Sequence, residues 1–587
     1  MNRIDDIYTR IADLDRPEIF ITLREQALVA AEYEASVQAN GPLAGMVLAV
    51  KDNVDVAGVP TTAACPGYAY TPETDAPAVA ALRAAGAVVI GKTNLDQFAT
   101  GLVGTRSPHG AVRDSRRPDR ISGGSSSGSA VAVALGIADI AIGTDTAGSG
   151  RVPAGLQGIV GIKPTLGVVS TEGVVPACAD YDVVTIFARE LSSANAAMAA
   201  MAKASGGRPF GADVRLAAPE HPVVVVPEQL PALDEAWKDA FAAAIATAGA
   251  AGFHVKTIDL TPFLDAAKLL YDDALVAQRY DAVGEYLSTV TDATAAGVDP
   301  TVASIIGNAN RFSAVELLRA RRRLAELKAQ ALTQWGGPSA LLIPTAPAHP
   351  SLAEVAADPI GVNSTMGTYT NFCNLFDLCA VAIPAGEVTE SDGSTAQFGV
   401  TLLAKSHEDG VVADLAARFL GEHDAGAATG AQRPEAVAEW PEAVAPWPEA
   451  VAPTVELAVF GAHMRGGPLV HELAGRGARW AGTVATAPHY RLVALDTVPP
   501  KPGLIRDPER GRSIHGEKWV LSPAALGEFL AALPEPMMLG SVELSDDPIV
   551  ISSANKSGNA AASRWVVGFG CSADAGMKGE EIDRDKW

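Results

Sequence analysis

The chain has 587 residues, of which 48% are hydrophobic and 19% are charged, and its formal net charge at pH 7 is −23. A chain of this length and hydrophobicity buries a large core in more than one domain, which excludes a protein that is disordered throughout. The acidic surplus argues against a nucleic-acid partner and against an anionic membrane surface, because both are bound through an excess of lysine and arginine.

The first 425 residues alternate short apolar runs with helical stretches. Buried strands are predicted for the apolar runs at 47–50, 87–90, 140–143, 223–226, 340–343 and 381–383. Helices are predicted for the Ala- and Leu-rich stretches at 76–85, 193–204, 233–248 and 314–332. Strands that alternate with helices in this way predict an α/β fold, in which helices cover both faces of a central sheet.

A seven-residue unit is then written three times, as PEAVAEW, PEAVAPW and PEAVAPT, at residues 434–454. The proline in every unit excludes a coiled coil, and three such short copies cannot stack into a solenoid. Together with the Ala/Gly-rich residues before it, the repeat predicts a semi-rigid spacer. We therefore divide the chain into a domain at 1–425, a linker at 426–454 and a domain at 455–587.

The part after the spacer has a different pattern. Strands are expected at 456–461, 478–484, 490–495 and 514–521, and one helix at 523–533. This order of elements predicts a small α+β domain.

Cysteine usage indicates a reducing compartment. The five cysteines are scattered and form no CxxC pair, so neither a disulfide framework nor a zinc site is expected. The N-terminal residues lack the basic and apolar segments of a signal peptide, and the longest apolar stretch, 130–142, is too short to span a bilayer. These features predict a cytoplasmic protein without a bound metal.

Lys51 is the first candidate for chemistry, because it ends the apolar strand predicted at 46–50. A lysine that leaves a buried strand can be desolvated, which lowers its pKa and allows it to act as a base. The alternative is a structural lysine that extends to solvent or pairs with Asp52 or Asp55.

The glycine- and serine-rich run at 122–129, SGGSSSGS, is open to several interpretations. A phosphate-binding loop would end in Gly-Lys-Ser/Thr, which is absent. The G-x-S-x-G pattern of a nucleophile elbow is present at 124–128, but an elbow follows a strand, whereas the preceding residues 113–120 are polar and contain proline. A flexible turn is the remaining alternative, and the run alone decides nothing.

A second glycine-rich loop, residues 143–153, directly follows the strand predicted at 140–143. Its Ser149 lies between small residues, so backbone N–H groups of the loop can point to one spot beside the hydroxyl, as an oxyanion hole requires. Ser149 follows Ser125 by 24 residues. With Lys51 upstream, these residues form a combination that is more informative than any one of them.

Residues 50–53 and 123–153 resemble the amidase signature family, whose members hydrolyse amides with a Ser–cis-Ser–Lys triad. The resemblance implies that Ser149 is the nucleophile, Ser125 the bridging serine and Lys51 the base. A serine hydroxyl is a poor nucleophile until a base removes its proton, which agrees with these roles.

The same resemblance implies further site residues. The backbone amides of Thr146, Ala147 and Gly148 would form the oxyanion hole, and Ser126 would support the network beside the substrate. Ala147 stands where glycine is commonest in the family, but it is small and leaves the triad intact.

Within the family, residues 25–420 are most similar to the allophanate hydrolases, and the similarity continues after the spacer. The motifs that carry it are at 92–104, 342–347, 358–360, 367–375, 460–463, 486–492 and 499–504. The implied fold is the amidase signature α/β fold with a mixed central sheet, followed by a small domain like the gamma-glutamyl cyclotransferases. The implied reaction releases ammonia from allophanate through an acyl-serine intermediate, without a cofactor.

Allophanate is a small anion, and a guanidinium can bind its carboxylate through two parallel N–H bonds. Arg279 and Tyr271 match substrate-contacting positions in the resemblance, although Asp272 and Asp273 depart from its usual small, apolar residues. The alternative is a surface helix arginine, paired with Asp273 or Asp281. Gly101 is expected to let the backbone approach the substrate.

The resemblance suggests that the C-terminal domain assists the decarboxylation of N-carboxycarbamate, with His463 as its candidate residue. The alternative for this domain is a non-catalytic assembly module. For the whole protein, the alternative is a broader amidase or carbamate (urethane) hydrolase that accepts neutral substrates. The expected partners are a small anionic amide substrate, a second copy in a homodimer and a separate enzyme that supplies the substrate.

Overall fold

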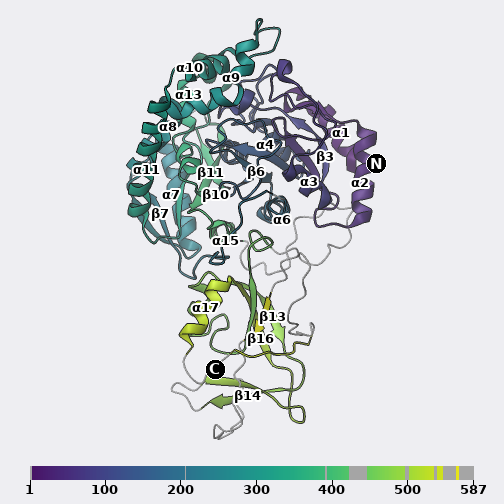
Figure 1. The fold of residues 1–587 in the computed structure, drawn as a ribbon, viewed down its shortest axis with the longest axis vertical. Coiled ribbons are helices and arrows are strands. Elements are labelled where there is room, and N and C mark those ends of the chain that lie inside the picture. The colour runs from purple at the N-terminus through teal and green to yellow at the C-terminus, as the bar shows by residue number, and fades with distance from the viewer. Residues whose placement is uncertain are drawn as a thin grey trace. The chain divides into compact units, whose positions relative to one another are not determined.

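The computed structural model describes residues 3–204, 206–390, 393–421, 446–495, 501–533, 539–545 and 563–566 (Figure 1). The chain divides into two compact units. Among the described residues, the first unit contains those within Met1–Arg208 and Pro222–Glu422 together with 446–450, and the second contains Pro209–His221 and those within Val451–Trp587. The sequence did not predict that Pro209–His221 group with the second unit. The domain boundaries at 425 and 455 stay a prediction. Most of the repeat and the last cysteine, Cys571, lie outside the described residues.

One sheet of eleven strands forms the centre of the first unit, in the order β1-β3-β2-β4-β6-β5-β10-β11-β9-β7-β8. Its strands are β1 (Phe20–Leu23), β2 (Val47–Lys51), β3 (Val88–Thr93), β4 (Ile140–Asp145), β5 (Val160–Lys163), β6 (Val183–Ala188), β7 (Val223–Pro227), β8 (His254–Ile258), β9 (Ala340–Pro344), β10 (Cys379–Thr389) and β11 (Thr395–Ala404). The sheet is mixed, since β2 pairs in parallel with β3 and β4, whereas β4 and β6 are antiparallel.

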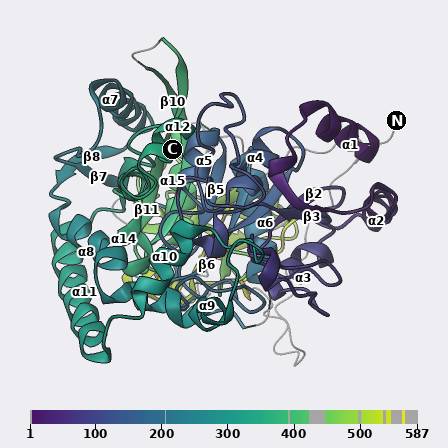
Figure 2. The same ribbon diagram turned by 90° about the horizontal axis from the view of Figure 1, so that it is seen from above.

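Helices surround this sheet (Figure 1). They are α1 (Arg3–Leu14), α2 (Gln26–Ala39), α3 (Pro77–Ala84), α4 (Ser127–Ala134), α5 (Val152–Gln157), α6 (Leu191–Ala202), α7 (Glu235–Ala250), α8 (Thr261–Asp272), α9 (Ala277–Thr289), α10 (Pro300–Ala309), α11 (Ala314–Trp335), α12 (Leu352–Ala357), α13 (Gly361–Met366), α14 (Asn371–Leu375) and α15 (Asp409–Phe419). Helices α4 and α5 pack together on the central strands, and α3, α6 and α15 form a second group. The predicted mixed sheet covered by helices is confirmed, and Figure 2 shows β2 and β3 at one end and β7 and β8 at the other.

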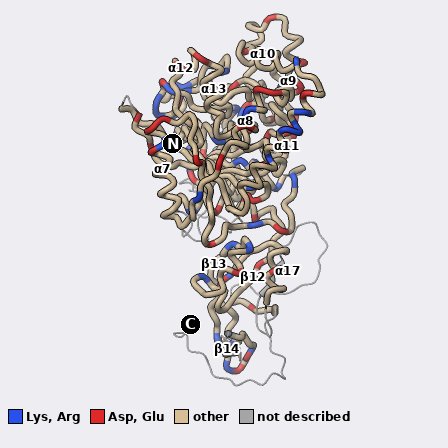
Figure 3. The backbone as a smooth tube through the Cα atoms, turned by 90° about the vertical axis from the view of Figure 1, so that its left-hand side faces the viewer, with Lys and Arg blue, Asp and Glu red and all other residues tan. Residues whose placement is uncertain are grey.

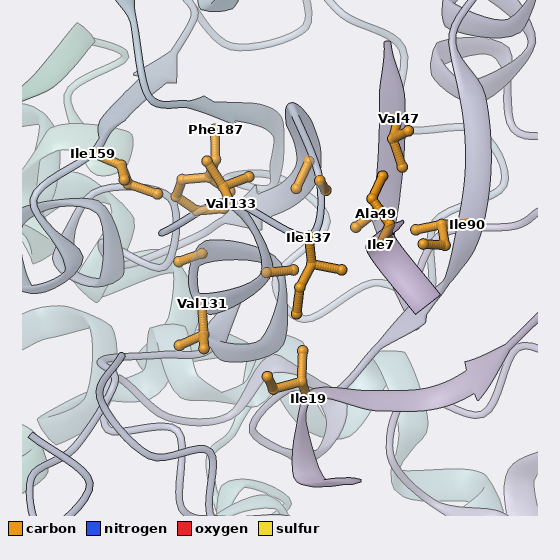
Figure 4. Close-up of a cluster of buried hydrophobic side chains, with 14 of the residues drawn as sticks. Ile7, Ile19, Val47, Ala49, Ile90, Val131, Val133, Ile137, Ile159 and Phe187 are labelled. Carbon is orange, nitrogen blue, oxygen red and sulfur yellow. The ribbon is translucent and has the colours of Figure 1, made fainter. Parts of the chain in front are cut away.

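Helix α4 contributes four residues, Ala130–Val133, to a cluster of buried hydrophobic side chains (Figure 4). Its residues from Ser127 to Val133 are all buried, because they are small and uncharged on every side of the helix and the two serine hydroxyls donate to backbone carbonyls. Val131 and Val133 pack in one cluster with Val47 of β2 and Phe187 of β6. This packing fixes the N-terminus of α4, and with it the serine-rich run that leads into the helix.

The second unit contains a four-stranded sheet in the order β13-β16-β12-β17 and a separate pair, β14 and β15. Its elements are β12 (Val455–Val459), α16 (His471–Ala474), β13 (Arg479–Ala485), β14 (Tyr490–Leu495), β15 (Lys501–Arg506), β16 (His515–Leu521), α17 (Pro523–Ala532) and β17 (Ser563–Val566). The four strands and the helix predicted for this part are present. Residues 546–562 and the tail after 566 lie outside the described residues.

The charged residues of the first unit carry both signs along its helices, as Figure 3 shows. In the part of the chain that the structure describes, no helix is long and apolar enough to cross a membrane. The four cysteines described there, Cys65, Cys178, Cys373 and Cys379, are free and buried.

Candidate active site

The sheet brings Lys51 and Ser125 together. Lys51 ends β2, and its Nζ donates to Ser125 Oγ at 2.8 Å and to Thr144 Oγ1 at 2.7 Å. Thr144 is available there because β4 is the parallel neighbour of β2. The alternative, an ion pair between Lys51 and the adjacent Asp52, is wrong, since Asp52 pairs with Lys92 at 3.1 Å.

Burial changes the protonation of Lys51. The side chain is 0% exposed, and desolvation of the ammonium lowers its pKa from 10.5 to about 7. The charge of Arg279 lowers this pKa further, whereas the charges of Asp96, Asp145 and Asp182 raise it. A substantial fraction of Lys51 is therefore neutral near pH 7, as a general base requires.

The serine-rich run approaches Lys51 as an irregular segment. The Gly124–Ser125 peptide bond is cis, and helix α4 begins two residues later, at Ser127. Ser126 Oγ donates to the carbonyl of Thr144 at 3.1 Å and so ties this segment to the end of β4. No strand directly precedes the run within the described residues, which agrees with the rejection of a nucleophile elbow.

A buried ion pair shapes the loop that carries Ser149. Asp145 ends β4 and accepts hydrogen bonds from Arg151 Nε at 2.9 Å and Nη2 at 3.0 Å. The same carboxylate accepts the backbone N–H groups of Gly148, at 2.9 Å, and Gly150, at 3.0 Å. The loop therefore folds around Asp145. Gly148 has a φ of +129°, and a Cβ there would lie 2.4 Å from Thr370 Oγ1, so a side chain is excluded.

Two of the three amides predicted for the oxyanion hole are available. Among the described residues, the backbone N–H groups of Thr146 and Ala147 have no hydrogen-bond acceptor, whereas that of Gly148 donates to Asp145. Ser149 is 3% exposed, and no hydrogen bond in the described part of the chain joins its Oγ to Ser125. The loop thus offers unsatisfied amides near a serine hydroxyl, which is the chemistry that an oxyanion needs.

Arg279 and Tyr271 form a buried cationic group. Arg279 is 1% exposed, and its Nη2 donates to Tyr271 Oη at 2.7 Å. Its Nη1 donates to Thr100 Oγ1 at 3.0 Å and to the carbonyl of Ala99 at 3.3 Å, whereas its Nε is buried without a partner. No described carboxylate lies within ion-pair distance of it. The alternative of a surface arginine paired with Asp273 or Asp281 is wrong, because Arg279 is buried and forms an ion pair with neither, and Asp273 caps the short helix at 274–276.

Gly101 has a structural role that the sequence did not reveal. A Cβ at this position would lie 2.6 Å from Cγ and Oδ2 of Asp96. Asp96 is fully buried and accepts the N–H groups of Gly104 at 3.0 Å and Arg106 at 2.9 Å. Gly101 is thus required by the packing against this carboxylate, and its approach to a substrate stays a prediction.

His463 lies in the second unit, in the loop after β12. Its Nε2 lies 3.0 Å from Glu472 Oε2, and its ring packs edge-on against Phe529 at a centroid distance of 5.2 Å. In the same loop, the N–H of Arg465 donates to Glu517 Oε2 at 2.7 Å. The imidazole is 5% exposed and hydrogen-bonded to a carboxylate, an arrangement that can hold and transfer a proton.

Several residues around Lys51 were not found from the sequence alone. Thr144, Asp145 and Asp182 are ordinary polar residues near strand ends, and Asp96 lies within a motif that was noted only for its resemblance. The one available signal was a polar residue at the end of a buried strand, as Thr144 and Asp145 are in β4. Within the described ranges, no group of three or more His, Cys, Asp or Glu residues could hold a metal ion.

The pKa of Lys51 predicts how amide hydrolysis depends on pH. We expect kcat/KM to rise with pH and to level off above about pH 7, because only neutral Lys51 accepts a proton and its pKa is about 7 rather than 10.5. Below that pH the rate should fall about tenfold per unit. Initial rates between about pH 5 and pH 9, in buffers of constant ionic strength, measure this limb. A limb near pH 10 would contradict the assignment.

Comparison with known proteins places this geometry in a family. Residues 7–412 match the Amidase family, and residues 455–584 match the Allophanate hydrolase C-terminal domain. The urea amidolyase of Lachancea kluyveri is 42% identical over 517 residues, which are 86% of this chain but 28% of that protein. The chain therefore spans little more than a quarter of the length of this curated relative.

Solved structures show the same relationship. Kluyveromyces lactis allophanate hydrolase has a TM-score of 0.83 and 35% identity, covering 99% of this chain and 94% of that chain. A crystal structure described as an amidase has a TM-score of 0.61 and 27% identity over 71% of this chain and 95% of its own. With the Lys51–Ser125 contact and the loop of Ser149 in the matched region, the chain belongs to the amidase family and carries an allophanate hydrolase C-terminal domain.

Proposed function

We propose that this protein is an amidohydrolase that releases ammonia from allophanate. The observation that carries the proposal is the buried guanidinium of Arg279, which has no carboxylate partner among the described residues. A buried, unpaired charge is costly, so a site that retains one is suited to a ligand of opposite charge. The likeness to Kluyveromyces lactis allophanate hydrolase supports the same substrate.

Arg279 would hold the carboxylate, and Tyr271 would orient the guanidinium. Allophanate carries its carboxylate one nitrogen away from the ureido carbonyl that is cleaved. Nε of Arg279 is buried without a partner, so it is an available donor. The hydrogen bond from Arg279 Nη2 to Tyr271 Oη, at 2.7 Å, fixes the plane of the guanidinium group. With its carboxylate bound to Arg279, allophanate would direct its terminal amide towards Ser149 and Ser125.

In the first step, Ser149 Oγ attacks the terminal carbonyl carbon of allophanate. Its proton passes to Ser125 while the proton of Ser125 passes to neutral Lys51, which accepts it across the 2.8 Å contact. The negative charge that forms on the carbonyl oxygen is stabilised by the N–H groups of Thr146 and Ala147.

In the second step, the tetrahedral intermediate breaks its C–N bond. The Lys51 ammonium returns a proton through Ser125 to the leaving nitrogen, which departs as ammonia. Water then attacks the acyl group on Ser149 with Lys51 again as the base. The products are free Ser149 and N-carboxycarbamate, so no cofactor is consumed.

The C-terminal unit would act on that product. N-carboxycarbamate needs a proton on nitrogen to lose carbon dioxide, and the pair formed by His463 and Glu472 can hold one. We assign the decarboxylating step to this unit. The alternative is that the unit has no catalytic role and serves only in assembly. In that alternative, His463→Gln would leave the rate of carbon dioxide release unchanged.

We also propose the partners of this enzyme. Its substrate would be supplied by a carboxylating enzyme that converts urea to allophanate, and the enzyme itself would be a homodimer. The name of the urea amidolyase relative, of which this chain spans 28%, supports a joint role with such an activity.

The proposed substrate is tested by comparing kcat/KM across small anionic and neutral compounds, of which malonamate and malonamide have nearly the same shape. Allophanate and malonamate are anionic, whereas malonamide and ethyl carbamate are neutral. We expect kcat/KM for the anionic amides to exceed that for the neutral compounds by at least about 100-fold, the scale of one buried charge pair. Equal rates across the panel would instead support the broader amidase or carbamate hydrolase.

A further inference from the structure

Asp96 is a fully buried carboxylate at the triad that the mechanism above does not use. It lies in the loop after β3, and its backbone N–H donates to the carbonyl of Ser125 at 3.1 Å. Its two carboxylate oxygens accept the backbone N–H groups of Gly104 and Arg106. The residue is therefore bound to the serine-rich segment on one side and to its own loop on the other.

The carboxylate lies directly against the peptide that precedes Ser125. A Cβ on Gly124 would be 2.1 Å from Asp96 Oδ2, so glycine is required there. Ser125 Oγ in turn accepts from Lys51 Nζ at 2.8 Å. Asp96 therefore contacts the same short segment, Gly124–Ser125, whose serine hydroxyl contacts the base.

Asp96 differs from the buried acids Asp52 and Asp145 in having no cation of its own. Asp52 pairs with Lys92 at 3.1 Å, and Asp145 pairs with Arg151 at 2.9 Å. For Asp96, no Lys or Arg side chain in the described ranges forms an ion pair. The charge of an unpaired buried carboxylate is available to whatever cation forms nearby.

We propose that Asp96 is a positioning residue, which holds Ser125 through its backbone and stabilises the ammonium form of Lys51 through its carboxylate. The inference rests on the proposed Ser149–Ser125–Lys51 mechanism. In that mechanism Lys51 must alternate between a neutral and a charged form, and burial disfavours the charged form. Asp96 offsets that cost, so that both forms are accessible at one pH.

The electrostatic surroundings of Lys51 agree with this role. Four charged groups act on it: Asp96 from the loop after β3, Asp145 from the end of β4, Asp182 from the segment before β6 and Arg279 from α9. Asp96 is the largest of the three that raise the pKa of Lys51. Asp182 is the weakest of the three, and its own pKa is raised by burial, which favours its uncharged form.

The deciding experiment is the pH dependence of Asp96→Asn in the full-length enzyme. Removing the charge should lower the pKa of Lys51, so the acidic limb of kcat/KM should move down by about one pH unit. The plateau rate should fall about tenfold, because the ammonium formed during the reaction loses the same stabilisation. If the limb stays at the wild-type pH or moves up, the inference is overturned, even if the enzyme is slower.

Asp114→Asn is a matched control. Asp114 is also buried, at 1% exposure, and accepts two backbone N–H groups, those of Arg116 and Arg117, but it is not among the charges that act on Lys51. The acidic limb of kcat/KM in Asp114→Asn should coincide with that of the wild-type enzyme. If Asp96→Asn fails to fold, Asp96→Ser keeps one acceptor for these amides and carries the same prediction.

A second readout needs no substrate. In the Ser149→Ala background, cyanate should carbamylate neutral Lys51, and mass spectrometry of the peptide that contains Lys51 gives the rate at each pH. The midpoint of this titration with pH should lie lower in the Ser149→Ala, Asp96→Asn double variant than in Ser149→Ala alone. Identical midpoints in the two proteins would overturn the inference. If allophanate is not the substrate, this titration still reports on Asp96, so the two failures can be told apart.

Discussion

Replacing Ser149 with alanine is expected to lower kcat for allophanate by at least about 10⁴-fold, because the substitution removes the only atom that forms the acyl bond. The fold should persist. Ser149 Oγ has no hydrogen-bond partner among the described residues, so its loss leaves no buried group unsatisfied. The loop is held instead by Asp145, Arg151 and the glycine N–H groups.

The measurement is ammonia release under saturating substrate, with circular dichroism and the melting temperature as checks on folding. Ser127→Ala is the matched control. Ser127 begins α4, next to the triad segment, and donates from its Oγ to the carbonyl of Asn94 at 3.3 Å, away from Lys51. It should retain activity within about tenfold, as a single neutral hydrogen bond implies. Turnover by Ser149→Ala above the background rate would exclude Ser149 as the nucleophile.

Replacing Arg279 with methionine is expected to lower kcat/KM for allophanate by about 10²- to 10³-fold, the cost of removing one partner of a buried charge pair. Most of the loss should be in KM, since the carboxylate that Arg279 binds does not itself react. For malonamide, which has no carboxylate, the loss should be within about tenfold. The comparison of the two substrates separates binding of the anion from general damage to the site.

Two further variants define the geometry of this anchor. Arg279→Lys keeps the positive charge but loses the planar guanidinium that binds a carboxylate through two N–H groups. Its affinity for allophanate should therefore lie between those of the wild type and Arg279→Met. Tyr271→Phe removes the oxygen that accepts from Arg279 Nη2 at 2.7 Å, and should raise KM by about tenfold while leaving the charge in place. Equal losses on allophanate and malonamide in Arg279→Met would show that Arg279 is structural.

Arg279 also affects the base, which links the two sites. Its positive charge lowers the pKa of Lys51. Arg279→Met should therefore move the acidic limb of the rate profile to higher pH, opposite to the shift expected for Asp96→Asn. Opposite shifts from two substitutions are difficult to explain by loss of stability, which would act on both variants alike.

Local pattern in the sequence predicted the class of the fold and the members of the triad. Apolar runs such as 47–50 and 140–143 became β2 and β4, because a strand buried on both faces must be continuously hydrophobic. Strands that depend on tertiary partners, such as β5 and β6, were missed, and so was the full width of the sheet. The run of β5, VGIK, is short and contains a glycine, whereas that of β6, VVTIFA, is apolar and β-branched and carries a strand signal that was overlooked.

The amino acids along the chain thus specify which chemical groups are present: a lysine at the end of a buried strand, two serines in glycine-rich loops and an arginine eight residues after a tyrosine. What these groups can do depends on how the fold brings them together. Lys51 reaches Ser125 because the sheet places β2 beside β4 and α4 fixes the serine run, and its pKa falls because the fold excludes water. Arg279 and Asp96 are left without ionic partners by the same packing, since burial and charge pairing arise from residues far apart in the chain.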